Sequence, residues 1–314
     1  MFVSPLGRST LWVSAAITLL SGCSAPPGQP PTATTQSVRD IGRAAVHGAW
    51  MLPEAKSEDL LYISTFDGVI VYSYPSDKQV GLLSGSGSEA YGLCSDEAGN
   101  LFVTDLEAQA VYEYAHGGTQ PIATFTQYPS QDFSPIDCSV DPVTDNLAVE
   151  SADSYSVYIF KHEGQTATIY ENPYAYGYFC TYDGSGNFFA RGTQYHIAEL
   201  PKGSSTFTNI KLSRPIEDLE GFAWDGKYLS ITNYTTTNTD YRIHVHGSRA
   251  TIVSSSILTN AKFVRQFTIY NHRFIAPDED ASQVTFWKYP GFGNSTGAIQ
   301  GLTDPEGSAI SVAR

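Results

Sequence analysis

The stretch "YGLCSDEAGNLFVTD", residues 91–105, holds two short apolar runs separated by a polar turn. The turn contains Gly99 and Asn100, the two residue types that most readily adopt the positive φ angles of tight turns. The run that follows, Leu101-Phe102-Val103, has the length and apolar character of a buried strand. This stretch therefore predicts a β-hairpin.

Segments similar to the second strand of this hairpin recur along the chain at regular intervals. Together with this strand, they start at positions 61, 101, 147, 188, 228 and 274, so successive repeats are 40, 46, 41, 40 and 46 residues apart. Similar turns precede several of them, at residues 141–146, 183–187 and 225–227. A period in the forties that is built from strands and turns is typical of a β-propeller.

Two more strand-like runs follow the hairpin in each repeat. In the repeat that begins at Tyr91 they are residues 111–114 and residues 121–125. Four strands make one propeller blade. The sequence thus predicts an all-β fold, a six-bladed β-propeller of four-stranded antiparallel blades, over residues 49–314.

The blade that begins at Leu61 has no innermost strand before it in the sequence. The chain ends with "LTDPEGSAISVAR", residues 302–314, in which residues 308–312 form a short β-prone run. An unpaired edge strand is an aggregation hazard, and ring closure removes it. We expect this C-terminal run to pair with the N-terminal blade and close the ring; the alternative is an incidental β-rich tail.

The N-terminus has the features of an export signal. Arg8 precedes an apolar run at residues 11–20, which is too short to span a bilayer and suits a signal-peptide core. It continues into Leu20-Ser21-Gly22-Cys23, which looks like a bacterial lipobox, where the cysteine is acylated, with chains such as palmitate, after cleavage before it. We expect a lipoprotein signal peptide at residues 1–22 and lipidation of Cys23; the alternative is an ordinary export signal with Cys23 incidental.

The segment after the lipobox is rich in Pro and Thr, and such a composition favours an extended tether over a packed core. We assign residues 23–48 to the acylated cysteine and this tether. The membrane is then a partner through the Cys23 lipid, and the protein is exported and anchored to the cell envelope. Ser24, in place of Asp, implies the outer membrane if the host is a diderm bacterium.

The charge balance disfavours nucleic acid as a partner. The chain has 18 Lys and Arg against 32 Asp and Glu, a formal net charge of −14. Such a surface repels polyphosphates. The sequence also shows no phosphate-binding loop, no nucleophilic serine motif and no helical zinc motif, so no catalytic residue is assigned. We expect a monomer.

Alignment of the repeats on their turn aspartate places several side chains at one end of the innermost strands, where they would line the mouth of the central channel. The candidate ligand-binding residues there are Tyr91, Asp137, Tyr178, Glu220, Gln266 and Glu306. Tyr91 and Tyr178, with Tyr174 and Tyr176, could stack on a sugar or a peptide. The alternative for these tyrosines is packing in the core and rim.

The phrase at residues 91–105 and its repeats resemble NHL and gluconolactonase-like six-bladed propellers, and the chain with its lipobox is similar to uncharacterised bacterial propeller lipoproteins. The gluconolactonase-like resemblance implies a divalent cation in the channel, held by oxygen ligands. The candidate metal ligands are Glu220, Glu306 and Asp137. No other cofactor is expected.

Two functions remain open from the sequence. The first is an extracytoplasmic binding or scaffold module for an unidentified protein, peptide or glycan. The alternative is a metal-dependent lactone or ester hydrolase that uses the central channel. We favour the binding module, because Tyr91 and Tyr178 occupy positions where further metal ligands would be needed.

Three cysteines lie in innermost strands. Cys94 is two residues before its turn aspartate, whereas Cys138 and Cys180 are three before theirs, so Cys94 faces the opposite side of its strand. Neighbouring blades pack face against opposite face, which leaves Cys94 and Cys138 as the adjacent pair that could form a disulfide. The pattern favours three buried thiols acting as small apolar side chains over this bond.

Overall fold

The computed structural model describes residues 48–83, 90–126, 133–152, 154–161, 164–192, 195–235 and 237–314. They belong to one compact unit, Val46–Arg314. The predicted signal peptide, Cys23 and nearly all of the predicted tether lie outside the described residues. Among the residues that are described, no helix is both long enough and apolar enough to cross a membrane.

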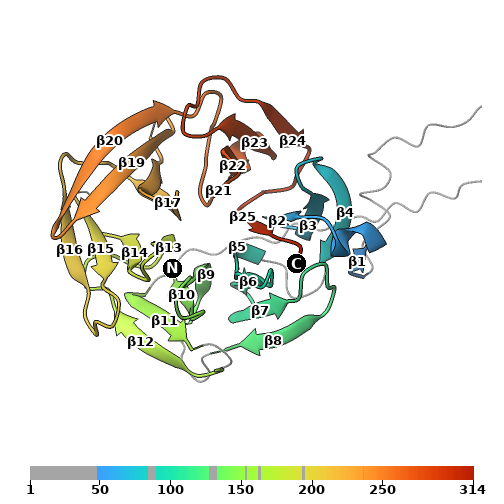
Figure 1. Cartoon of the computed structure of the whole chain (residues 1–314), viewed down its shortest axis with the longest axis horizontal. Helices are drawn as coiled ribbons and strands as arrows, with labels where there is room; N and C mark the ends of the chain where they lie inside the picture. The colour runs from blue at the N-terminus through green and yellow to red at the C-terminus, as the bar shows by residue number, and fades with distance from the viewer. Residues whose placement is uncertain are drawn as a thin grey trace, which may run out of the picture. The chain divides into compact units, whose positions relative to one another are not determined.

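The described unit is an all-β propeller, in which small sheets stand side by side around a central axis (Figure 1). Except in the sheet that closes the ring, the strands of each repeat run outward from the axis in chain order, so the first strand is innermost. In the described segments the helical structure is limited to two short 3₁₀ turns, η1 (Pro53–Lys56) and η2 (Glu279–Ala281). The predicted β-propeller is thus confirmed.

Three of the sheets are separate four-stranded antiparallel blades, as the repeats predicted. The strands of the first are β5 (Ala90–Ser95), β6 (Leu101–Asp105), β7 (Ala110–Tyr114) and β8 (Pro121–Phe125). Those of the second are β9 (Pro135–Val140), β10 (Leu147–Ser151), β11 (Ser156–Phe160) and β12 (Ala167–Glu171). Those of the third are β21 (Thr268–Tyr270), β22 (Arg273–Asp278), β23 (Gln283–Lys288) and β24 (Gly297–Gln300).

Two further four-stranded units are joined into one eight-stranded sheet, which the repeats did not predict. One unit comprises β13 (Cys180–Tyr182), β14 (Phe188–Arg191), β15 (His196–Leu200) and β16 (Thr208–Leu212). The other comprises β17 (Leu219–Trp224), β18 (Leu229–Asn233), β19 (Thr239–His246) and β20 (Arg249–Ile257). The outer strand β20 is 9 residues long, and its first residues pair in parallel with the end of β16. We attribute the junction between the two units to the unusual length of β20.

The remaining sheet closes the ring with both ends of the described unit. Its strands are β1 (Trp50–Met51), β4 (Lys78–Leu83), β3 (Gly68–Ser73), β2 (Leu60–Thr65) and β25 (Ser308–Ser311), in that spatial order. The C-terminal strand β25 is antiparallel to β2, with Ser311 opposite Leu60 and Ser308 opposite Ile63 (Figure 1). The predicted pairing of the C-terminal strand with the N-terminal blade is present.

Side-chain contacts extend this closure beyond the strand ladder. The backbone N–H of Gly307 donates to Ser64 Oγ over 2.8 Å, and that of Ala313 donates to Asp59 Oδ1 over 3.0 Å. Ile310 is 7% exposed and packs in a cluster with Leu61. The last strand is thus fixed by hydrogen bonds at both ends and by apolar contacts between them.

The core consists of apolar clusters between successive sheets. Tyr62 and Val103 pack in one cluster, and Phe133, Tyr158 and Phe160 pack in the next. The rings of Phe133 and Tyr158 meet edge to face at 4.8 Å. Each large side chain of this kind contributes about 1.5–3 kcal/mol through burial, so the contacts between sheets dominate the stability.

We predict that deletion of residues 308–314 abolishes cooperative folding. The deletion exposes the edge of β2 and removes Ile310, whose burial alone contributes about 1.5–3 kcal/mol. Thermal denaturation followed by circular dichroism, with light scattering to detect aggregation, tests this. Deletion of Arg314 alone, an exposed residue, is the control and leaves the melting temperature unchanged; equal melting of both truncated chains would contradict the closure.

Candidate functional site

The innermost strands approach one another closely at one level of the channel, where glycines lie in β5, in β17 and directly before β25. A Cβ atom on Gly92 would lie 2.6 Å from Asp137 Oδ1, and one on Gly307 would lie 2.6 Å from the Tyr91 carbonyl oxygen. Gly221 is even more confined, against the carbonyl of Arg265. Only glycine fits at these positions, and the channel is narrow there.

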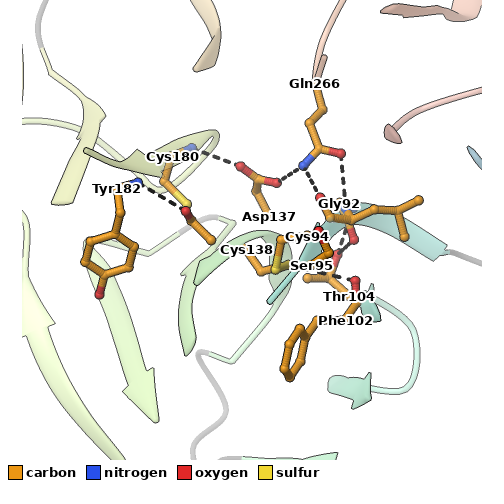
Figure 2. The surroundings of a disulfide bond; sticks show 12 residues. Gly92, Cys94, Ser95, Phe102, Thr104, Asp137, Cys138, Cys180, Tyr182 and Gln266 are labelled. Carbon is orange, nitrogen blue, oxygen red and sulfur yellow. Dashed lines mark hydrogen bonds between the residues drawn. A yellow bond between two sulfur atoms is a disulfide. The ribbon is translucent and has the colours of Figure 1, made fainter. Parts of the chain in front are cut away.

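Gln266, which precedes β21, crosses the channel at this level. Its Nε2 donates to the Leu93 carbonyl over 2.8 Å and to Asp137 Oδ1 over 2.5 Å (Figure 2). Its Oε1 accepts from the backbone N–H groups of Leu93 at 3.0 Å and Ser308 at 3.1 Å. Asp137 Oδ2 accepts from Cys180 N at 2.9 Å. Gln266 and Asp137 form a closing layer that links β5, β9, β13 and β25.

Burial dominates the electrostatics of this closing layer. Asp137 is 1% exposed, and burial raises its pKa to about 8 although backbone N–H groups and Gln266 donate to it. Glu150 lies opposite Asp137 on the adjacent strand, and burial followed by repulsion from Asp137 raises its pKa well above the ordinary value. The folded protein therefore retains protons here at neutral pH.

Arg265 organises the mouth of the channel next to the closing layer. Its Nη1 donates to Tyr91 Oη over 3.0 Å and lies 3.5 Å from Glu306 Oε2, while its Nη2 lies 3.1 Å from Glu279 Oε2. Its guanidinium also lies 4.6 Å from the ring centroid of Phe263. Arg265 was not predicted from the sequence, although it directly precedes the aligned residue Gln266.

Glu220 and Tyr178 complete the mouth from the eight-stranded sheet. The guanidinium of Arg191 lies 5.4 Å from the ring centroid of Tyr178. Burial raises the pKa of Glu220 to about 7, while Arg191 and Arg265 lower it in part. Glu220 Oε2 has no hydrogen-bond partner in the described part of the chain.

The structure divides the six predicted mouth residues into two groups. Tyr91, Tyr178, Glu220 and Glu306 surround the two arginines, and electrostatic interactions connect them. Asp137 and Gln266 instead form the closing layer, as described above. The repeat alignment fixed the level along each strand but did not show which side chains reach across the channel.

The three candidate metal ligands lie in different surroundings. Asp137 binds Gln266 and Cys180 N, and Glu306 lies beside the permanent positive charge of Arg265. Within the described ranges, no group of three or more His, Cys, Asp and Glu side chains is arranged to hold a metal ion. The divalent cation stays a prediction from the resemblance alone.

A cavity of ≈ 340 Å³ is lined by residues of β5, β9, β13, β17, β25 and the Gln266–Tyr270 segment. The aromatic part of its lining consists of Tyr182, Phe222, Trp224, Phe267 and Tyr270. Its lining residues, all in the described part of the chain, are uncharged, in contrast with the mouth.

A disulfide joins Cys94 to Cys138 (Figure 2). Both cysteines line this cavity. The bond links β5 to β9, with the two Cα atoms 5.7 Å apart, while Cys180 is free and buried. The sequence favoured three thiols over this bond. The close approach of Gly92 to Asp137 brings the two strands within disulfide range, which the residue pattern could not show.

Comparisons with known proteins bear on the fold. No family model and no curated protein matches the chain. Among solved structures, a chain in the crystal structure of a nidogen/laminin complex superposes with a TM-score of 0.67 at 11% identity, covering 82% of this chain and 99% of that chain. At this identity the likeness shows the fold alone, and it supports the β-propeller.

We predict that stability falls as the pH rises between about 4 and 8. Burial raises the pKa of Asp137 from 3.8 to about 8 and those of Glu220 and Glu306 to about 7. Over this range the folded state holds protons that the unfolded chain has released, so raising the pH favours unfolding. Melting temperatures between pH 5 and pH 8.5 test this.

The variant Asp137→Asn should flatten this pH dependence, whatever its effect on the melting temperature at one pH. The control is Asp67→Asn, which removes an exposed carboxylate and should leave the wild-type slope intact. An unchanged slope in Asp137→Asn would show that Asp137 titrates normally.

Proposed function

We propose that this chain is an exported, lipid-anchored, six-bladed propeller of the NHL kind, which acts as an extracytoplasmic binding module through the mouth of its channel. Six repeats in the sequence and the four-stranded units of the fold support the blade number. The lipobox that ends at Cys23 supports the lipid anchor.

The observation that carries the proposal is the closing layer beneath the mouth. Gln266 and Asp137 bind four innermost strands, so the mouth side chains rest on a hydrogen-bonded base. Above it Arg265 is held by Tyr91, Glu306 and Glu279. Polar side chains that are fixed before a ligand arrives reduce the entropy cost of binding.

The mouth also contains groups that the protein itself leaves unpaired. Glu220 is 7% exposed, yet its Oε2 has no partner among the described residues. A buried carboxylate oxygen without a hydrogen bond is costly for stability, and a ligand that donates to it recovers that cost. This favours recognition at the mouth over a purely structural role for these residues.

A photo-crosslinking amino acid placed at residue 176 of the mouth face tests the binding function. We predict that the full chain crosslinks to a cell-envelope component from this position in intact cells. Replacement of Lys227, an exposed residue in a turn between innermost and second strands, provides the control. Adducts from position 227 only, or from neither position, would contradict binding at the mouth.

A separate experiment tests the anchor. We predict that Cys23→Ser abolishes labelling of the chain with radioactive palmitate and moves the protein out of the membrane fraction. Cys180→Ala, which removes a buried thiol, should retain both properties. Retention of the label by Cys23→Ser would refute lipidation at this residue.

A further inference from the structure

Two exposed tyrosines are stacked at the edge of the mouth face. Tyr155 is 45% exposed and Tyr176 is 54% exposed, and their ring centroids lie 4.2 Å apart with an interplanar angle of 29°. Tyr155 precedes β11, and Tyr176 belongs to the connection between β12 and β13. Together they present flat aromatic surface to solvent, only two residues along the chain from Tyr178 of the mouth.

The connection that carries Tyr176 is held in place by buried polar contacts. Asn172 is 1% exposed; its backbone N–H donates to the Tyr155 carbonyl over 2.6 Å and its Nδ2 to the Arg191 carbonyl over 3.0 Å. The N–H of Gly177 donates to the Ser154 carbonyl over 2.8 Å. These bonds tie the tyrosine pair to the strand of Arg191, so its position relative to the mouth is fixed in advance.

Gly177 shows how closely this connection approaches the blade beneath it. A Cβ atom at this position would lie 2.5 Å from Glu150 Oε2. Only glycine permits this close approach. It fixes the positions of Tyr176 and Tyr178, the chain neighbours of Gly177, relative to the strand of Glu150. The arrangement is a preorganised aromatic surface, not a loose loop.

At the mouth, the buried side-chain atoms that have no hydrogen-bond partner among the described residues include the acceptors Glu220 Oε2 and Glu306 Oε2 and the donor Arg265 Nε. Glu220 Oε2 is buried without a hydrogen-bond partner, and its carboxylate interacts electrostatically with Arg191. The Arg191 guanidinium lies 5.4 Å from the ring centroid of Tyr178. A ligand for this pair must both donate and accept at neighbouring atoms.

We infer that the ligand of the mouth is a carbohydrate. Adjacent sugar hydroxyls can donate to Glu220 and accept from Arg191, and the apolar face of a pyranose ring fits a tyrosine ring. Glu306 and Glu279 lie beside Arg265, and Glu220 interacts with both arginines. The mouth therefore presents charges of both signs and favours neither an anionic nor a cationic ligand. A neutral polyol satisfies both groups. This inference rests on the proposed binding function and adds the chemical class of its ligand.

The test uses the full chain and four soluble tetrasaccharides as probes, composed of β1,4-linked N-acetylglucosamine, β1,4-linked glucose, α1,4-linked glucose and β1,4-linked mannose. Isothermal titration calorimetry measures binding. We expect at least one probe to bind, and Glu220→Gln to weaken it about 10-fold, because a neutral amide oxygen accepts a weaker hydrogen bond than a carboxylate oxygen. Glu217→Gln, three residues away and exposed, should bind like the wild type.

The tyrosine pair provides an independent test on the surface, where folding is not at risk. Tyr176→Ala should weaken binding at least several-fold, whereas Tyr176→Phe, which keeps the ring, should retain it. Binding that neither Glu220→Gln nor Tyr176→Ala affects would place the sugar elsewhere and overturn the inference.

Two other outcomes also overturn it. The first is that none of the four tetrasaccharides binds; the second is that a tetralysine peptide or inorganic phosphate binds in their place with the same dependence on Glu220. In either case, crosslinking from position 176 to an envelope component would still support a binding function at the mouth. Failure of the inference is therefore distinguishable from failure of the proposed function.

Discussion

The pairing of β25 with β2 is the constraint on which the rest of the structure depends. It places the end of the chain at the centre of the ring, where Ser308 donates to Gln266 and Gly307 donates to Ser64. Gln266 in turn fixes Asp137, and Asp137 accepts from Cys180. The closing layer, the mouth above it and the cavity therefore all require that the last strand has docked.

The sequence predicted the repeated part of the fold well because each repeat has a strong local signal, a turn followed by a buried strand. The absence of an innermost strand before Leu61 in the sequence also predicted that the C-terminal strand closes the ring. Two features were missed: β1, only two residues long, and the junction of β16 with β20. Both depend on where an outer strand ends in space, and no periodic pattern of apolar residues encodes that position.

The site was predicted less completely, for a related reason. Alignment of the repeats gave the level of Tyr91, Tyr178, Glu220 and Glu306, which do converge. The alignment did not show how far each side chain extends across the channel. Gln266 and Asp137, whose side chains cross it, were therefore grouped with the mouth. Arg265 was missed because it lies one residue before the aligned level. The disulfide was not favoured from the sequence either, because it depends on the short distance between β5 and β9, which Gly92 permits.

Closure by the final strand has a consequence for biosynthesis. The ring stays open until Ser308–Ser311 leaves the ribosome, and at ~5–20 residues per second translation of the chain takes roughly 15–60 s. Throughout that time β2 lacks its inner neighbour, so the edge of this strand is open to chaperones and to pairing with strands of other chains.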